Sequence, residues 1–404
     1  MRISSKPRLI DRRQLLGASV LAGIGATVMP RIAFSQGNGP IPIGTLTPLT
    51  GAGANYGGHM RDAVAGVIAA TNEQGGILGR QIHLVSEDDQ TNPDAGVRAA
   101  RKLIDVDKVT AILGVWASAV TTAVAPLCWE SGTALFCTSG ADSINRLPHK
   151  GFIFRTEPGA ELQTEQVTHF MLGEGAKRLA YMGPQTPFTE PSIRRMKDVA
   201  TKAGAEVASV VYEADKASYR SEVDKILASK PDFIYFGGYA PDTIVLTKDL
   251  YKAGYSGHVV GPSYVIDADF LKTVPKEATE GAYVYYDATS NEAGAVDKLK
   301  AILKIDQPDA YTAQAYDHAN LALLAVAAGK EASGAGIRDN VRKISQGDGE
   351  KVGFVLDGLK LLAAGKKINY EGASGPCDFD EIGNITKVET SFDVVKDGKL
   401  AHYK

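Results

Sequence analysis

The chain has 404 residues, of which 44% are hydrophobic and 23% are charged, and its formal net charge at pH 7 is −3. These values are typical of a soluble globular protein and exclude a disordered or fibrous chain. The length is sufficient for two domains. Basic residues are concentrated in the first 36 positions, so the remainder is mildly acidic, which argues against nucleic acid as a partner.

Residues 1–36 have the pattern of an export signal. Basic residues near the start are followed, over residues 15–29, by an uncharged apolar segment, which is too short to span a bilayer comfortably. Small residues then precede a predicted cleavage site between Ser35 and Gln36. No later segment is apolar enough to span a membrane, so we expect a protein of the periplasm that is not itself membrane-spanning.

Arg12 and Arg13 resemble the arginine pair of a twin-arginine signal, which would mean export after folding in the cytoplasm. A chance arginine pair in an ordinary secretory signal is the alternative. The three cysteines, Cys128, Cys137 and Cys377, cannot all pair with one another. We expect buried free thiols, and folding before export would make disulfides unnecessary.

Predicted strands and helices alternate along most of the chain after residue 41. Strands are expected at residues 41–46, 81–86, 111–115, 134–138, 178–182, 206–212, 232–236, 258–260, 282–286 and 388–395. Helices are expected at residues 59–73, 92–105, 119–130, 163–173, 191–203, 220–229, 242–253, 313–328, 337–345 and 355–363. This succession implies an α/β fold of parallel, doubly wound sheets with right-handed crossovers. The same rhythm returns after residue 151, so we predict two similar lobes.

The first candidate for a binding site follows the apolar run at residues 111–115, which is typical of a buried parallel strand. Ser118 precedes a predicted helix at residues 119–130 whose first turn contains no acid. We expect Ser118 to be the N-cap of this helix, with its hydroxyl and the free backbone N–H groups pointing the same way. Such a corner favours an anion, because the helix dipole and the donors both attract negative charge. The plainer interpretation is that Ser118 only caps its own helix.

A second corner of small and polar residues follows the strand predicted at residues 134–138. It contains Gly140, Ala141 and Asp142. Two strand ends that open side by side form a crevice, and open α/β sheets bind ligands in such crevices. The sequence therefore predicts a ligand site between the two corners.

Other kinds of site find little support in the sequence. The glycines of residues 51–57 do not have the spacing of a dinucleotide-binding loop, and the seven histidines lack the spacing of metal ligands. No serine lies in a G-x-S-x-G elbow. We therefore expect capture of a ligand rather than catalysis, with no cofactor and no metal. An exported enzyme on the same fold is the alternative from another class, and only Asp142 and the acids at residues 87–89 favour it.

Several stretches resemble, in this order, one family of binding proteins. They are IGTLTPLTGAGANYGG at residues 43–58, GGILG at 75–79, EDD at 87–89, GVWAS at 114–118, YFGGY at 235–239, GPS at 261–263, and Tyr311 with AYD at 315–317. Over residues 41–404 the chain is similar to type I periplasmic binding proteins of the leucine/isoleucine/valine-binding family, the soluble receptors of ABC importers. The resemblance implies two lobes joined by a three-crossover hinge, a small-molecule ligand between them, and an ABC permease of the inner membrane as partner. Lobe 1 would comprise residues 41–157 and 288–375, and lobe 2 residues 158–287 and 376–404.

The resemblance also implies roles for individual residues. Ser118 matches the serine that holds a ligand carboxylate, and Gly140 matches the carbonyl that accepts a hydrogen bond from the ligand ammonium. The further residues expected in the pocket are Tyr56, Ala141, Phe188, Tyr239 and Tyr286. The function implied is capture of an amino acid of the branched-chain or hydrophobic class, or of a related small solute.

Three residues depart from the family pattern and leave the ligand open. Asp142 stands where the relatives have a threonine that helps to bind the carboxylate, and Ser263 stands where they have a glutamate that pairs with the ammonium. A ligand carboxylate beside Asp142 would be repelled unless Asp142 turns elsewhere. Trp116 is bulkier than its counterpart, and amide- and urea-binding members have a similar tryptophan. The alternative ligands are therefore a short amide, urea or an aromatic carboxylate, and a sensor subunit is an alternative to a transport receptor.

Overall fold

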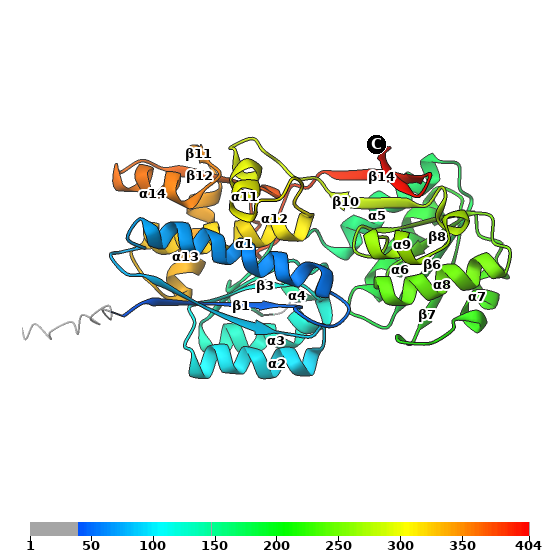
Figure 1. Cartoon of the computed structure of the whole chain (residues 1–404), viewed down its shortest axis with the longest axis horizontal. Coiled ribbons are helices and arrows are strands. Elements are labelled where there is room, and N and C mark those ends of the chain that lie inside the picture. The colour runs from blue at the N-terminus through cyan, green and yellow to red at the C-terminus, as the bar shows by residue number, and fades with distance from the viewer. Residues whose placement is uncertain (1–38, 147, 404) are drawn as a thin grey trace, which may run out of the picture. The chain divides into compact units, whose positions relative to one another are not determined.

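The computed structural model describes residues 39–146 and 148–403 (Figure 1). The export signal predicted for residues 1–36 lies outside the described residues. The strands are β1 (Ile41–Thr47), β2 (Ile82–Asp88), β3 (Ala111–Val115), β4 (Ala134–Cys137), β5 (Ile153–Arg155), β6 (Arg178–Pro184), β7 (Glu206–Tyr212), β8 (Phe233–Phe236), β9 (His258–Pro262), β10 (Tyr283–Asp287), β11 (Glu350–Val352), β12 (Ile368–Gly372), β13 (Gly375–Pro376), β14 (Thr390–Lys396) and β15 (Lys399–His402). The helices are α1 (Ala54–Glu73), α2 (Pro93–Arg101), the π-helical η1 (Lys102–Val106), α3 (Ser118–Ser131), α4 (Ser143–Arg146), α5 (Ala160–Gly173), α6 (Thr189–Lys202), α7 (Arg220–Leu227), α8 (Ala240–Lys252), α9 (Ala268–Thr273), α10 (Lys276–Thr279), α11 (Ala295–Leu303), α12 (Ala310–Gly329), α13 (Gly334–Ser345) and α14 (Val355–Ala363).

Five parallel strands form the first sheet, in the order β2-β1-β3-β4-β5. Its central strand β3 is buried along its whole length, in agreement with the uninterrupted apolar sequence AILGV. Helices α1 and α12 pack against each other on one face of this sheet, and α2 and α3 pack against each other on the other face (Figure 1). Residues of α11, α13, α14 and β12 complete the same hydrophobic core.

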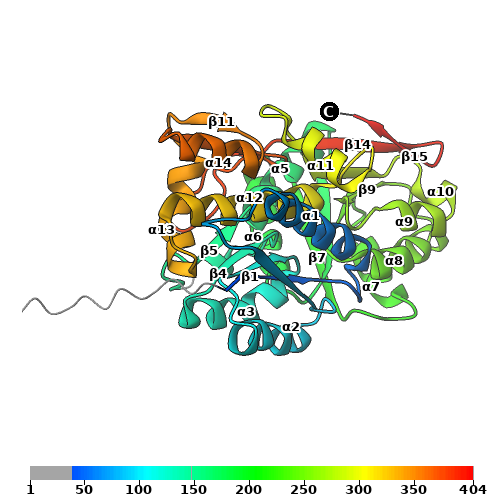
Figure 2. The ribbon, with the colours of Figure 1, turned by 60° about the vertical axis from the view of Figure 1, so that its left-hand side comes forward.

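Seven strands form the second sheet, in the order β15-β14-β10-β9-β8-β6-β7. Strands β6 to β10 run parallel, whereas β14 and β15 pair in antiparallel fashion at one edge, where the chain ends (Figure 2). Successive side chains of β6 point to opposite faces of the sheet. Tyr181 packs with α5 and α6 in one hydrophobic core, and Met182 packs with α7, α8 and α9 in another. Helices therefore cover both faces of this sheet, and the predicted α/β fold of doubly wound sheets is confirmed.

Strands β11, β12 and β13 form a small third sheet beside the first. The chain crosses three times between this half of the fold and the half that contains the second sheet: between β5 and α5, between β10 and α11, and between β13 and β14. These three crossings lie together. In the third crossing, the carbonyl of Gly383 accepts a hydrogen bond from the backbone N–H of Arg155 at 2.8 Å, and the carbonyl of Glu389 accepts one from Ala288 at 2.8 Å. The two sheets are therefore joined through one narrow bundle of neighbouring segments.

Helix α1 begins at Ala54, earlier than the predicted start at His59. The glycine-rich stretch expected to be a loop forms the first turns of the helix, because Gly57 lets it approach the preceding segment closely. A Cβ on Gly57 would lie 2.1 Å from the carbonyl oxygen of Pro48. The strand predicted at residues 388–395 is followed by a further strand, β15.

The three cysteines are free and buried, as predicted. Burial raises the pKa of Cys137 to about 11, so its unreactive thiol form dominates at neutral pH.

Within residues 39–146 and 148–403, no helix is both long and apolar enough to cross a bilayer.

Candidate functional site

Helix α3 begins at Ser118 itself, with Ala117 at the N-cap position. The prediction that Ser118 caps this helix is therefore wrong, and the plainer interpretation of its hydroxyl as a cap fails with it. The hydroxyl oxygen instead accepts a hydrogen bond from the backbone N–H of Ala141, at 3.1 Å. A hydroxyl that accepts a hydrogen bond keeps its own proton to donate, and Ser118 lines a cavity.

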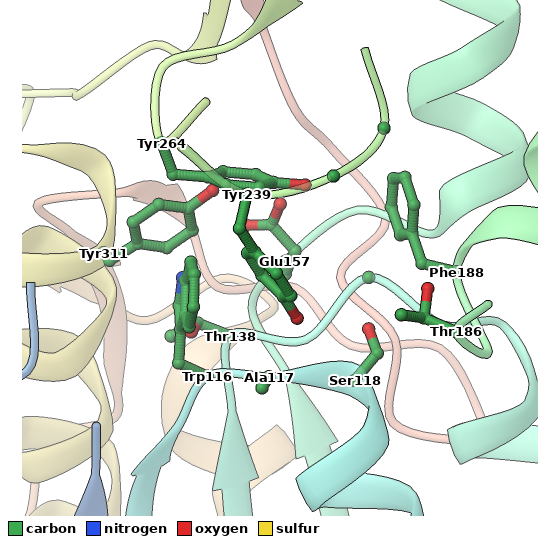
Figure 3. A pocket seen from close by; sticks show the side chains of 13 residues that line it. Trp116, Ala117, Ser118, Thr138, Glu157, Thr186, Phe188, Tyr239, Tyr264 and Tyr311 are labelled. Atoms are coloured by element: carbon green, nitrogen blue, oxygen red, sulfur yellow. The ribbon is translucent and has the colours of Figure 1, made fainter. Parts of the chain in front are cut away.

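The cavity, called the central cavity below, lies at the ends of strands from both sheets (Figure 3). Its volume is about 30 Å³. A space of this size holds water, so a larger solute can enter only if the walls move apart. The lining residues are Trp116, Ala117, Ser118, Thr138, Gly140, Glu157, Thr186, Phe188, Gly237, Gly238, Tyr239, Tyr264 and Tyr311.

Five aromatic side chains, called the aromatic cluster, form one wall of the central cavity and the layer behind it: Tyr56, Trp116, Tyr239, Tyr264 and Tyr311. The ring centroid of Trp116 lies 5.4 Å from those of Tyr239 and Tyr264. Tyr56 stacks on Trp116 with the centroids 5.9 Å apart. These separations are those of favourable aromatic pairs. Because Trp116 follows β3 whereas Tyr239 and Tyr264 follow β8 and β9, the cluster joins the two sheets.

Polar contacts join the start of α1 to the segment that follows β9. The hydroxyl of Tyr56 donates to the backbone carbonyl of Ser263 at 3.2 Å. The side-chain amide of Asn55 donates to the carboxylates of Asp267, at 3.0 Å, and Asp269, at 3.2 Å. These bonds hold opposite walls of the central cavity together, although none of the five residues lines it.

Glu157 is the carboxylic acid that the described residues contribute to the cavity wall. It lies on the first crossing and is 6% exposed. Its Oε1 accepts a hydrogen bond from Nε2 of Gln163 at 2.9 Å, and its Oε2 accepts one from Nε2 of Gln314 at 2.7 Å. Burial, followed by the carboxylate of Asp287, raises the pKa of Glu157 well above its ordinary value. Burial also raises the pKa of Asp287, to about 7.

Several predicted site residues line the central cavity: Trp116, Ser118, Gly140, Phe188 and Tyr239. Ala141 contributes the N–H that binds the Ser118 hydroxyl, and Tyr56 lies behind the wall. The carbonyl of Gly140 accepts from Nη1 of Arg155 at 3.0 Å and from the backbone N–H of Ala160 at 2.7 Å. Two donors occupy its two lone pairs, so, contrary to the expectation, this carbonyl has none left for a ligand ammonium.

Five predicted site residues do not line the cavity: Tyr56 and Ala141, described above, and Asp142, Ser263 and Tyr286. Oδ2 of Asp142 accepts from the backbone N–H of Glu161 at 2.9 Å, and its Oδ1 lies 3.7 Å from Nη2 of Arg155. Its carboxylate therefore binds the start of α5 and faces a buried guanidinium, whose positive charge offsets its own. The hydroxyl of Tyr286 donates to Asp393 at 3.2 Å, across strands β10 and β14.

No role was predicted for the other lining residues: Ala117, Thr138, Glu157, Thr186, Gly237, Gly238, Tyr264 and Tyr311. Thr138, Glu157 and Thr186 each follow the end of a strand, so they could have been predicted in the same way as Ser118. Tyr311 lies in the almost wholly buried helix α12, where no local signal separates a cavity residue from a core residue. The buried hydroxyl of Thr138 has no hydrogen-bond partner in the part of the chain that the structure describes.

Residues 40–384 match the family model described as periplasmic binding protein. The chain is 26% identical, over 390 residues, to the Leu/Ile/Val-binding protein BraC3 of Rhizobium johnstonii, a match that covers 94% of this chain and 98% of that protein. It is similar in structure to a leucine binding protein of Thermotoga maritima, with a TM-score of 0.77, 21% identity, and coverage of 90% and 98%. It is also similar to an ABC transporter solute binding protein of R. palustris in complex with benzoate, with a TM-score of 0.73, 20% identity, and coverage of 90% and 95%. At these identities the two structures share the fold of this chain.

Proposed function

We propose that this chain, which belongs to the periplasmic binding protein family, is the receptor subunit of an ABC importer and captures a small carboxylate solute in the central cavity. Amino acids of the apolar class are the first candidates, because its relatives from R. johnstonii and T. maritima are named for leucine or for leucine, isoleucine and valine. The observation that carries the proposal is the Ser118 hydroxyl, which lies at the start of α3 on the wall of the cavity. The role implies a periplasmic location and an inner-membrane permease as partner.

The start of α3 suits a carboxylate. The helix has 14 residues and no acid in its first turn, so its dipole and its free N–H groups favour an anion at this end. The hydroxyl of Ser118 adds a donor at the same place. A charged acceptor strengthens such a hydrogen bond.

Entry of the solute requires the walls to separate. In this proposal residues 41–157 and 288–375 move as one lobe, residues 158–287 and 376–404 move as the other, and the three neighbouring crossings act as the hinge. A solute shifts the population toward the closed form only through contacts that it makes with both lobes together. Ser118 would supply such a contact from one lobe, and Phe188 and Tyr239 would supply it from the other.

The test is a thermal-shift screen of apolar amino acids, aromatic carboxylates, short amides and urea, followed by calorimetry on the solutes that stabilise the protein. We expect a carboxylate to raise the Tm in a concentration-dependent manner, and the amides and urea to leave it unchanged. Ser118→Ala should reduce the shift, whereas Thr122→Ala, on the same helix but off the cavity wall, should not. A panel in which no carboxylate raises the Tm would contradict the proposal. A bound solute recovered chemically unchanged distinguishes capture from catalysis.

An aromatic carboxylate is the second candidate. The aromatic cluster favours it, and so does the carbonyl of Gly140, which already accepts two hydrogen bonds. The solute binding protein of R. palustris was solved in complex with benzoate. Benzoate and an apolar amino acid in the same screen rank the two candidates directly.

A further inference from the structure

Glu157 places a carboxyl group inside a cavity that is walled by aromatic rings. Figure 3 shows it among Tyr239, Tyr264 and Tyr311. Gln163 of α5 and Gln314 of α12 hold its two oxygens from opposite sides. Each amide occupies one lone pair of a carboxyl oxygen that can accept a second hydrogen bond. The carboxyl group of Asp287 is a third hydrogen-bond partner. Glu157 is therefore fixed in position, and its four lone pairs still leave one accepting position for a solute.

The surroundings of this carboxyl group are those of a cation site. The faces of tyrosine and tryptophan rings carry negative potential and attract a cation placed over them. A carboxylate beside such rings adds a strong, charge-assisted acceptor for an N–H donor. Removal of water from the closed cavity strengthens both interactions.

We propose that Glu157 binds a positively charged nitrogen of the solute, so that the solute is an amino carboxylate rather than a simple carboxylic acid. The inference rests on the proposed function, because it takes the carboxylate of the solute to lie at Ser118. The nitrogen cannot use the carbonyl of Gly140, which Arg155 and Ala160 already fill. Glu157 is the carboxyl acceptor that the described residues of the cavity wall offer.

The charged groups around Glu157 determine how its protonation responds to a cation. Asp287, from the second crossing, opposes its ionisation, and Arg155, from β5, favours it. The phenols that face it, Tyr264 and Tyr311 among them, have a pKa raised by burial and stay neutral. Burial and Asp287 raise the pKa of Glu157, so Glu157 binds a proton more readily than an exposed glutamate does. A cation beside Glu157 favours its charged form, so binding of an ammonium releases a proton and binding of an acid without an amino group does not.

The test compares solutes that differ only in the amino group: L-leucine with 4-methylpentanoate, and L-phenylalanine with 3-phenylpropanoate. Calorimetry on the full chain, at about pH 6.5, should show the amino form of at least one pair bound about tenfold more tightly or better. Glu157→Gln should abolish this preference. Asp142→Asn is the matched control, because it removes a carboxylate of the neighbouring network that does not line the cavity, and it should keep the preference.

The proton count provides a second measurement, on the unaltered chain. Titrations in two buffers of different ionisation enthalpy should show protons released on binding of the amino acid and no release on binding of the des-amino acid. This readout does not depend on whether Glu157→Gln folds.

The outcomes separate the inference from the proposed function. Equal affinity within both pairs, a preference for the des-amino acids, or a preference that survives Glu157→Gln overturns the inference and leaves capture of a carboxylate intact. Binding of an amino acid without proton release also overturns it. Failure of all four solutes and of benzoate to bind overturns the proposed function as well.

Discussion

Gly140 and Phe188 touch across the central cavity, and the contact leaves no room for a larger residue at the glycine. A Cβ on Gly140 would lie 2.7 Å from Cε2 of Phe188. Gly140 follows β4 of the first sheet, whereas Phe188 follows β6 of the second. The close approach of the two walls therefore depends on the absence of a side chain at this position.

Gly140→Ala is expected to destabilise the closed form by about 1–3 kcal/mol, the usual cost of overpacking a well-packed contact. Affinity for the carboxylate solute should fall accordingly in calorimetry. Gly58→Ala, where an added Cβ meets open space on α1, should leave it unchanged. The double variant Gly140→Ala/Phe188→Leu should regain part of the loss. Full affinity in Gly140→Ala would show that Phe188 does not close against Gly140.

Ser118→Ala is expected to weaken binding by about 1–3 kcal/mol, because it removes a hydrogen bond to a charged group. The matched control is Thr122→Ala, since the hydroxyl of Thr122 donates to the backbone carbonyl of Ser118 at 2.8 Å without lining the cavity. An affinity of Ser118→Ala equal to that of the unaltered protein would remove Ser118 from the site.

Tyr56→Phe tests the hydrogen bond between opposite walls. Loss of the bond from Tyr56 to the carbonyl of Ser263 should cost the closed form about 0.5–1.5 kcal/mol, while the ring and its packing on Trp116 remain. Small-angle X-ray scattering of the solute-free variant should give a larger radius of gyration than the unaltered protein, and the solute should bind less tightly. Tyr251→Phe, at a tyrosine 48% exposed on α8, should change neither quantity.

His318 is expected to make the protein less stable in acid. It is fully buried in α12, its Nε2 lies 2.8 Å from Oγ1 of Thr156, and burial lowers its pKa to about 3. Below about pH 6.5 His318 therefore binds a proton in the unfolded chain but not in the folded chain. The contribution of His318 to the free energy of unfolding thus falls by up to about 1.4 kcal/mol per pH unit as the pH decreases.

His318→Gln should reduce this acid sensitivity. The difference in the free energy of unfolding between variant and unaltered protein, measured in urea at pH values between about 7 and 5, should shift in favour of the variant as the pH decreases. His59→Gln, at an exposed position on α1, should show no such trend. A pH-independent difference for His318→Gln would mean that the imidazole can accept a proton in the folded state.

Much of the fold could be predicted, because apolar runs such as AILGV in β3 and the long apolar stretch of α12 are local patterns. Errors arose where local patterns mislead. Glycines at the start of α1 suggested a loop, although Gly57 serves close packing against Pro48. Elements such as β13, with 2 residues, and α10, with 4, are too short to show a period.

The part of the cavity wall near Ser118 and Gly140 was predictable, since parallel strands deliver their carboxyl ends to one edge of a sheet. Tyr311 was not predictable in this way, because it comes from a helix far along the chain. The hydrogen bonds of Glu157 to Gln163 and Gln314 were not predictable either, because these partners approach only when α5 and α12 pack around the first crossing.

The order of residues was thus enough to predict the α/β class and the strand ends that line the central cavity. Folding alone decided which polar atoms remain available there. The hydroxyl of Ser118 lines the central cavity and does not cap α3, because Ala117 occupies the N-cap position. The carbonyl of Gly140 and the carboxylate of Asp142, in contrast, are engaged by Arg155 and the start of α5. The physical reason is that a buried polar group forms hydrogen bonds with the donors or acceptors that packing places next to it. These partners come from distant segments of the chain, which the local sequence does not reveal.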